Sequence, residues 1–115
     1  MAIIKNIEHD LPLALDSLVV YNEGQIVSRT LAQNSAVSFT LFAFDKGEEI
    51  SSHHSRGDAM VTILDGSAQI TVGDTVHTVN KGQTLVMPAN VPHALLAVTP
   101  FKMSLCVIFP PKSQA

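Results

Sequence analysis

Short β-rich runs alternate with turn signals from residue 25 onward, and this spacing constrains the fold more than any other feature of the sequence. The runs span residues 25–31, 37–44, 50–54, 59–64, 68–72, 75–79, 84–87, 93–98 and 101–109. Turn residues recur about every eight to twelve positions, a spacing that is typical of β-sandwiches and barrels. Only residues 3–18 could hold a short helical turn. The sequence therefore predicts an all-β fold with about nine to eleven short strands.

Dipeptides and tripeptides rich in Gly, Asp and Asn mark the predicted turns. Asp65-Gly66, Gly73-Asp74 and Asn80-Lys81-Gly82 are hairpin signals, because these residue types tolerate the positive φ of tight turns. Pro110-Pro111 should end the last strand, since proline cannot donate to a ladder. We therefore expect three hairpins between residues 59 and 87.

The composition fits one domain and excludes several kinds of partner. Of the 115 residues, 46% are hydrophobic and 15% are charged, with a net charge of −3, which provides enough apolar material for one core. The seven basic residues are spread singly along the chain, so we expect no nucleic-acid binding. The apolar stretch 11–20 is broken by Pro12 and Asp16 and is shorter than the roughly 20 residues that a spanning helix needs. We expect a single domain over residues 1–115, without membrane insertion or a signal peptide.

The single cysteine and the two-sided apolar strands bear on location and assembly. Cys106 has no partner for an internal disulfide, which agrees with a cytoplasmic location. Residues 38–44 and 103–109 are apolar on both faces of the predicted strands, and such strands need a second cover. We therefore expect a homodimer in which an outer sheet face packs on a partner. A thick barrel wall is the alternative explanation.

Two segments resemble the two motifs of the cupin superfamily. Residues 47–66 contain the run Gly-Glu-Glu-Ile-Ser-Ser-His, which ends at His53, and they close with Leu-Asp-Gly. Residues 82–97 contain the run Gly-Gln-Thr-Leu-Val-Met-Pro, followed by Ala-Asn-Val-Pro-His, which ends at His93. The resemblance implies a cupin-type double-stranded β-helix, a jelly-roll-like barrel with both histidines directed into it. Asn90 stands where the family usually has glycine, and we expect it to adopt the same left-handed conformation.

The resemblance also implies a metal, but the ligand set differs from the family pattern. In typical cupins three His and one Glu bind a divalent ion such as Zn, Mn, Fe or Ni. His53 and His93 match the first and last ligand positions, whereas Ser55 stands at the second His position and Ala59 at the Glu position. His54 should point away from the barrel unless a β-bulge shifts the register by one residue. The candidate metal ligands are therefore His53, His93 and His54.

Three hypotheses for the pocket follow from these residues. In the first, a register shift or a further side chain such as His77, Gln69 or Ser55 completes a metal site. In the second, the pocket is free of metal, and His53 and His93 are polar anchors for a small ligand. In the third, the two histidines are satisfied by hydrogen bonds and no ligand binds.

The candidate small-molecule pocket has polar anchors surrounded by apolar walls, as ligand pockets usually have. Its predicted lining residues are Ser55, Val61, Ile63, Met87 and His77. With a divalent metal, the resemblance implies a small oxygenase, isomerase or decarboxylase acting on a small molecule. Without a metal, the barrel would be a non-catalytic module that binds or senses a small metabolite.

Overall fold

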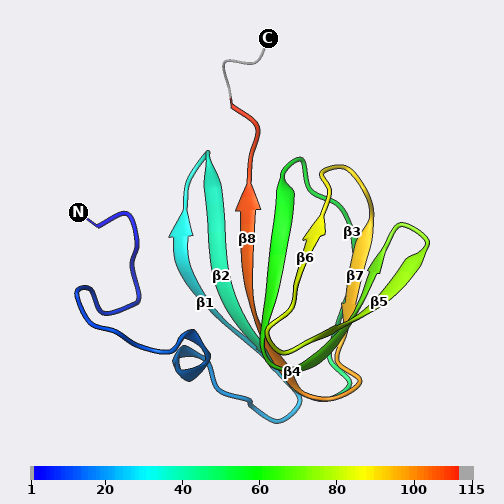
Figure 1. Cartoon of the computed structure of the whole chain (residues 1–115), viewed down its shortest axis with the longest axis horizontal. Coiled ribbons are helices and arrows are strands. Elements are labelled where there is room, and N and C mark those ends of the chain that lie inside the picture. Colours follow the sequence, from blue (N-terminus) through cyan, green and yellow to red (C-terminus); the bar gives the residue numbers. More distant parts are fainter. Residues whose placement is uncertain (1, 112–115) are drawn as a thin grey trace.

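The computed structural model describes residues 2–111, and in that range it contains eight strands and one short 3-10 helix (Figure 1). The elements are η1 (Leu15–Leu18), β1 (Ile26–Gln33), β2 (Val37–Phe44), β3 (Glu49–His53), β4 (Asp58–Val72), β5 (Thr75–Asn80), β6 (Thr84–Met87), β7 (His93–Leu96) and β8 (Phe101–Ile108). The prediction of an all-β fold is confirmed, with fewer strands than the turn spacing predicted. No helix among the described residues has the length and apolar character needed to cross a membrane.

The strands pair antiparallel in one curled sheet with the order β1-β2-β8-β4-β7-β3. The long strand β4 belongs to both halves of the barrel. Its residues 58–66 pair with β8 and 59–62 with β6, while 67–72 pair with β5 and 69–72 with β7. In Figure 1 this strand descends through the centre and continues toward β5 on the right. The sheet therefore closes around its own interior through a single continuous strand.

Two of the three predicted hairpins are wrong, and β4 is the reason. The strand runs through Asp65-Gly66 without a turn. Its register against β8 shifts between Ile63 and Asp65, and Gly66, at φ +71°, lets it bend as it leaves β8 for β5. The turn at Asn80-Lys81-Gly82 connects β5 with β6, but each of these strands pairs with β4 and not with the other. Of the three predicted hairpins, only the one at Gly73-Asp74 joins two strands that pair with each other, β4 and β5.

The barrel interior is a packed apolar core. Phe44 of β2 and Phe101 of β8 are fully buried, and their rings stack with centroids 4.5 Å apart. The buried core comprises Phe44, Ala59, Val61, Ile63, Ala68, Ile70, Val79, Met87, Leu95, Ala97, Phe101 and Met103. These side chains fill the interior, and β3 ends and β7 begins at one end of the barrel.

The N-terminal segment covers part of the outer face of the sheet. Leu15, Leu18 and Val19 belong to one apolar cluster with Leu41 and Ala43 of β2. Figure 1 shows this segment passing along the β1 side of the barrel. The apolar outer side of β2, which suggested a partner, is therefore covered in part by the same chain.

Polar contacts fasten the end of this covering segment to the sheet. Tyr21 donates a hydrogen bond to Asp65 Oδ2 at 2.5 Å, and Lys102 Nζ donates to the Asp16 carbonyl at 2.7 Å. Lys102 Nζ also lies 5.1 Å from the Tyr21 ring centroid. Burial, the hydrogen bond and charge of Asp65, and the charge of Asp16 together raise the pKa of Tyr21 far above 10.0. Tyr21 therefore stays a neutral donor over the whole physiological pH range.

Candidate functional site at the barrel mouth

A β-bulge and strand pairing bring His53 and His93 together at the mouth of the barrel. β3 pairs with β7 through Ile50 opposite Leu95 and His53 opposite His93, so β3 carries one extra residue between these two pairs. Residues three apart face opposite sides of a regular strand, so the bulge is what places Ile50 and His53 on the same face. A register shift of one residue, which the sequence left open, is therefore present in β3 and lies between Ile50 and His53.

The two imidazole rings converge on each other. The Nε2 atoms of His53 and His93 lie 3.1 Å apart, and the rings meet at 69° with centroids 4.3 Å apart. A straight N–H···N hydrogen bond of that length would hold the centroids about 5.4 Å apart. The shorter centroid distance means that the contact between the two rings is bent and is not a straight N–H···N hydrogen bond.

The hydrogen bond of the other ring nitrogen sets the tautomer of His53. His53 Nδ1 lies 3.0 Å from the Ser51 carbonyl oxygen. A carbonyl oxygen can only accept, so Nδ1 carries the proton, and Nε2 of the neutral ring has a free lone pair. That lone pair faces His93.

His93 is the buried member of the pair. Its side chain is 5% exposed, whereas His53 is exposed at the rim. Burial lowers the pKa of His93, the His53 and His54 rings lower it further, and the Val91 backbone opposes the shift. The contact with Val91 does not reach hydrogen-bond geometry, because Nδ1 of His93 is buried without a partner. His93 is therefore neutral at pH 7 and has one unsatisfied ring nitrogen.

The other predicted ligand positions do not complete a metal site. Ser55 Oγ accepts from the Gly57 amide at 3.1 Å, and Ala59 is buried in the core. Asp58 Oδ1 accepts from the Ala89 amide at 2.8 Å, which fastens the loop before β7. His54 follows the end of β3 and is exposed, though near enough to act on the pKa of His93. Within residues 2–111, no group of three His, Cys, Asp or Glu side chains is arranged to hold an ion.

The predicted pocket walls are part of the packed core. Val61, Ile63 and Met87 are each at most 1% exposed. His77 lies on β5 opposite Ile70 of β4 and is half-buried. Strand β4 lies between His77 and β7, the strand that carries His93, since Ile70 is in turn opposite Leu95. The structure thus joins His53 with His93 and places His77 on the same inner face, away from them.

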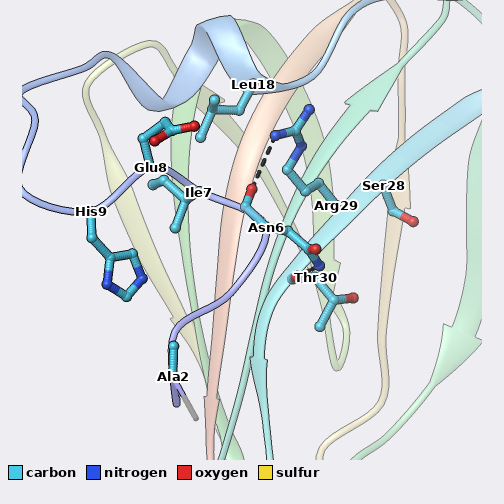
Figure 2. Close-up of a pocket in the computed structure, with 9 residues that line it drawn as sticks. All are labelled: Ala2, Asn6, Ile7, Glu8, His9, Leu18, Ser28, Arg29 and Thr30. Carbon is cyan, nitrogen blue, oxygen red and sulfur yellow. Dashed lines mark hydrogen bonds between the residues drawn. The ribbon is translucent and has the colours of Figure 1, made fainter.

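A second hollow, which the sequence reasoning missed, lies between the N-terminal segment and β1. Figure 2 shows this open groove, with a volume of about 1070 Å³. Arg29 donates to the Asn6 carbonyl at 3.0 Å, and Asn6 Nδ2 donates to the Thr30 carbonyl at 2.7 Å. Asn6 and Arg29 thus hold the segment to the edge of the sheet, and we assign the groove a structural role. The segment has no clear periodicity in sequence that would have predicted this contact.

Comparison with known proteins places the chain in a family. The profile of the cupin domain family matches residues 40–109. A solved structure of a conserved protein of unknown function from Streptococcus pyogenes is 50% identical, with a TM-score of 0.94 over 96% of this chain and 97% of that one. A cupin superfamily protein from Desulfitobacterium hafniense is 35% identical, with a TM-score of 0.90 over 95% of this chain and 100% of that one. A search of curated proteins found no match.

The curled antiparallel sheet and the two histidines at its mouth define a small double-stranded β-helix barrel. The chain belongs to the cupin superfamily, as its two motifs predicted. A Cupin 2 conserved barrel domain protein from Leptotrichia buccalis is 41% identical, with a TM-score of 0.80 over 82% of this chain and 46% of that one. The descriptions of these three relatives name no substrate, so the function has to be argued from the site.

Proposed function

We propose that the barrel mouth binds a divalent transition metal through Nε2 of His53 and His93 and that this metal holds a small-molecule ligand. The proposal rests on two observations together: the two Nε2 atoms lie 3.1 Å apart, and Nδ1 of His93 is buried without a hydrogen-bond partner. We place this function in the cytoplasm, in keeping with the single cysteine.

Both neutral forms of the isolated pair leave a polar requirement unmet. If His93 donates from Nε2 to His53, its Nδ1 becomes a buried acceptor without a donor, which costs about 1–3 kcal/mol. If His93 carries its proton on Nδ1, two lone pairs face each other across 3.1 Å. A cation between the Nε2 atoms removes the second conflict and leaves Nδ1–H beside the Val91 backbone. Metal-bound histidines commonly direct the other N–H toward a backbone carbonyl, as His53 does toward Ser51.

The donor set fits an open site and not a closed structural one. With metal–nitrogen distances of about 2.0–2.1 Å, two nitrogens 3.1 Å apart subtend about 100° at the ion, which suits two adjacent ligand positions. Imidazole nitrogens suit Zn, Fe and Ni, and Mn accepts them together with oxygen donors. The remaining positions fall to water or to oxygen atoms of the ligand. A bound ion would supply Lewis-acid polarisation of a ligand oxygen, the chemistry that an isomerase or decarboxylase needs. An oxygenase would need a redox-active ion, which Zn is not.

A second candidate function is metal-free binding of a small polar metabolite. The specific observation in its favour is that Ser55 and Ala59 occupy two ligand positions of the family and that the described residues offer no third ligand. In that case the lone pair of His53 would accept from the metabolite directly.

Metal binding to tag-free protein tests the proposal. The protein is stripped with a chelator and titrated calorimetrically with Zn²⁺, Ni²⁺ and Mn²⁺, in the wild type and in His53→Ala, His93→Ala and the double variant. We expect one site per chain, a loss of at least about tenfold in affinity for each single variant, and no binding in the double variant. His77→Ala is the matched control, since it removes an inner-face imidazole outside the pair. Wild-type protein that binds none of these ions, or a double variant that binds as well as wild type, would contradict the proposal.

A further inference from the structure

A hollow of about 290 Å³ lies at the end of the sheet where β4 begins and β8 ends (Figure 1). It is lined by Arg56, Asp58 and Ala89 together with residues 108–111. Neither histidine of the mouth pair lines it. The hollow is therefore separate from the metal site proposed above and has a cation, an anion and an apolar wall of its own.

The guanidinium group of Arg56 is exposed and is positioned by an aromatic ring. Its Cζ lies 4.7 Å from the centroid of the Phe109 ring, and the Phe109 amide donates to the Ala36 carbonyl at 3.0 Å. Within residues 2–111 the guanidinium group makes no hydrogen bond or ion pair. A guanidinium over a ring face keeps its N–H donors free, and their fork matches the two oxygens of a carboxylate. Arg56 therefore presents a positive charge and a free set of donors to the hollow.

Asp58 supplies a negative charge to the same hollow. Its Oδ1 accepts from the Ala89 amide at 2.8 Å, which fixes the carboxylate and leaves Oδ2 for another donor. Gly57 fixes the backbone between the two charged residues, because a Cβ there would lie 2.6 Å from the Ile108 carbonyl oxygen. In the part of the chain that the structure describes, Arg56 and Asp58 thus lie two residues apart and do not pair with each other.

We propose that this hollow binds a free α-amino acid with an apolar side chain. The carboxylate of the amino acid accepts from Arg56, and its ammonium group donates to Asp58. A simple anion is repelled by Asp58 and a simple cation by Arg56, so a zwitterion complements the pair better than either. Residues 108–111 are Ile-Phe-Pro-Pro, an apolar wall that suits the side chain of leucine or phenylalanine.

Amide chemical-shift titration of the isotopically labelled full chain with L-leucine and L-phenylalanine tests this inference. A chelator in the buffer keeps metal out of the measurement, since amino acids themselves bind metal ions. We expect the amides of Gly57 and Ala89, which flank Asp58 and line or adjoin the hollow, to shift with a Kd of about 1 mM or tighter. Two analogues of leucine each lack one charge: isocaproate has no amine and isoamylamine has no carboxylate. Each should bind at least about tenfold more weakly than leucine.

Three single variants locate the site. Arg56→Gln removes the positive charge, and Asp58→Asn removes the negative charge but keeps an oxygen that can accept from the Ala89 amide. Each should raise the Kd for leucine at least about tenfold. Lys46→Gln is the matched control, because it removes an exposed positive charge in the turn after β2, outside the hollow. It should bind leucine as the wild type does.

The proposal is overturned if the Gly57 and Ala89 amides do not shift at about 10 mM amino acid, if isocaproate binds as well as leucine, or if a folded Arg56→Gln variant keeps its affinity. The analogues are measured on the wild type, so the test stays decisive where a variant fails to fold. The double variant of His53 and His93 should still bind leucine. The outcome is therefore independent of the metal titration.

Discussion

Replacing Gly66 by alanine should destabilise the fold more than the same replacement at another glycine of similar backbone conformation. Gly66 has φ +71°, and a Cβ there would lie 2.2 Å from the Pro100 carbonyl oxygen and 3.1 Å from Phe101 Cα. Both are backbone atoms, so they cannot move aside as a flexible side chain would. The left-handed conformation costs about 1–2 kcal/mol for a residue with a Cβ, and the overlap adds about 1–3 kcal/mol.

Gly82→Ala supplies the control, because Gly82 has φ +86° and no atom lies within 4 Å of the place that its Cβ would take. It should lose only the conformational contribution, and the smaller entropy of the unfolded alanine chain affects both variants alike. Urea unfolding followed by far-ultraviolet circular dichroism measures the free energy of unfolding of each variant. We expect Gly66→Ala to lose about 1–3 kcal/mol more than Gly82→Ala. Equal losses would refute the close approach of β4 to the turn before β8.

Two further predictions concern the pH dependence of stability. Tyr21→Phe should lower the free energy of unfolding by about 0.5–1 kcal/mol at pH 7, because one partly exposed hydrogen bond to Asp65 is lost. Since the folded pKa of Tyr21 is raised above 10.0, the wild type should also lose stability as pH rises above 10. A Tyr21→Phe variant that loses stability with the same slope above pH 10 would contradict this. The folded pKa of His93 is lowered from 6.5, chiefly by burial, so its contribution is fully present above pH 6.5 and decreases as pH falls below it, because the unfolded chain takes up the proton first. Chemical unfolding in chelator should therefore show a weaker acid loss for His93→Gln than for wild type, and parallel curves would count against a buried neutral His93.

The strand positions were largely predictable, because local pattern and local structure agree there. Residues 37–44 and 84–87 were predicted as strands with the bounds that β2 and β6 have. Asn90 was predicted to be left-handed and has φ 65°. These features depend on backbone preferences that a few residues determine by themselves.

The path of β4 was not predictable, because its local signal and its tertiary role differ. Asp65-Gly66 has the chemistry of a two-residue hairpin. In the structure the positive φ of Gly66 allows β4 to bend between the part that pairs with β8 and the part that pairs with β5. A hairpin turn at Gly66 would instead reverse the chain and end the strand there. Only the pairing of residues far apart in sequence distinguishes a bend from a turn.

The candidate site was predictable in part. The resemblance to the cupin motifs implied that His53 and His93 both point into the barrel, and the structure brings their Nε2 atoms within 3.1 Å of each other. The bulge between Ile50 and His53 has no signal in the residues Ser51 and Ser52, so the register of His54 and Ser55 was left open. The cover formed by the N-terminal segment was missed because residues 3–18 show no clear periodicity. The apolar outer side of β2, which this segment covers in part, was therefore interpreted only as a surface for a partner chain.

The continuity of β4 has a consequence for how the barrel opens. The two halves of the barrel share this one strand, since its first part hydrogen-bonds to β8 and its last part to β5 and β7. Loosening of one half should therefore disturb the backbone of the other, and we expect the two halves to unfold together. The rim that carries the two imidazoles is thus held by the cooperativity of the entire domain.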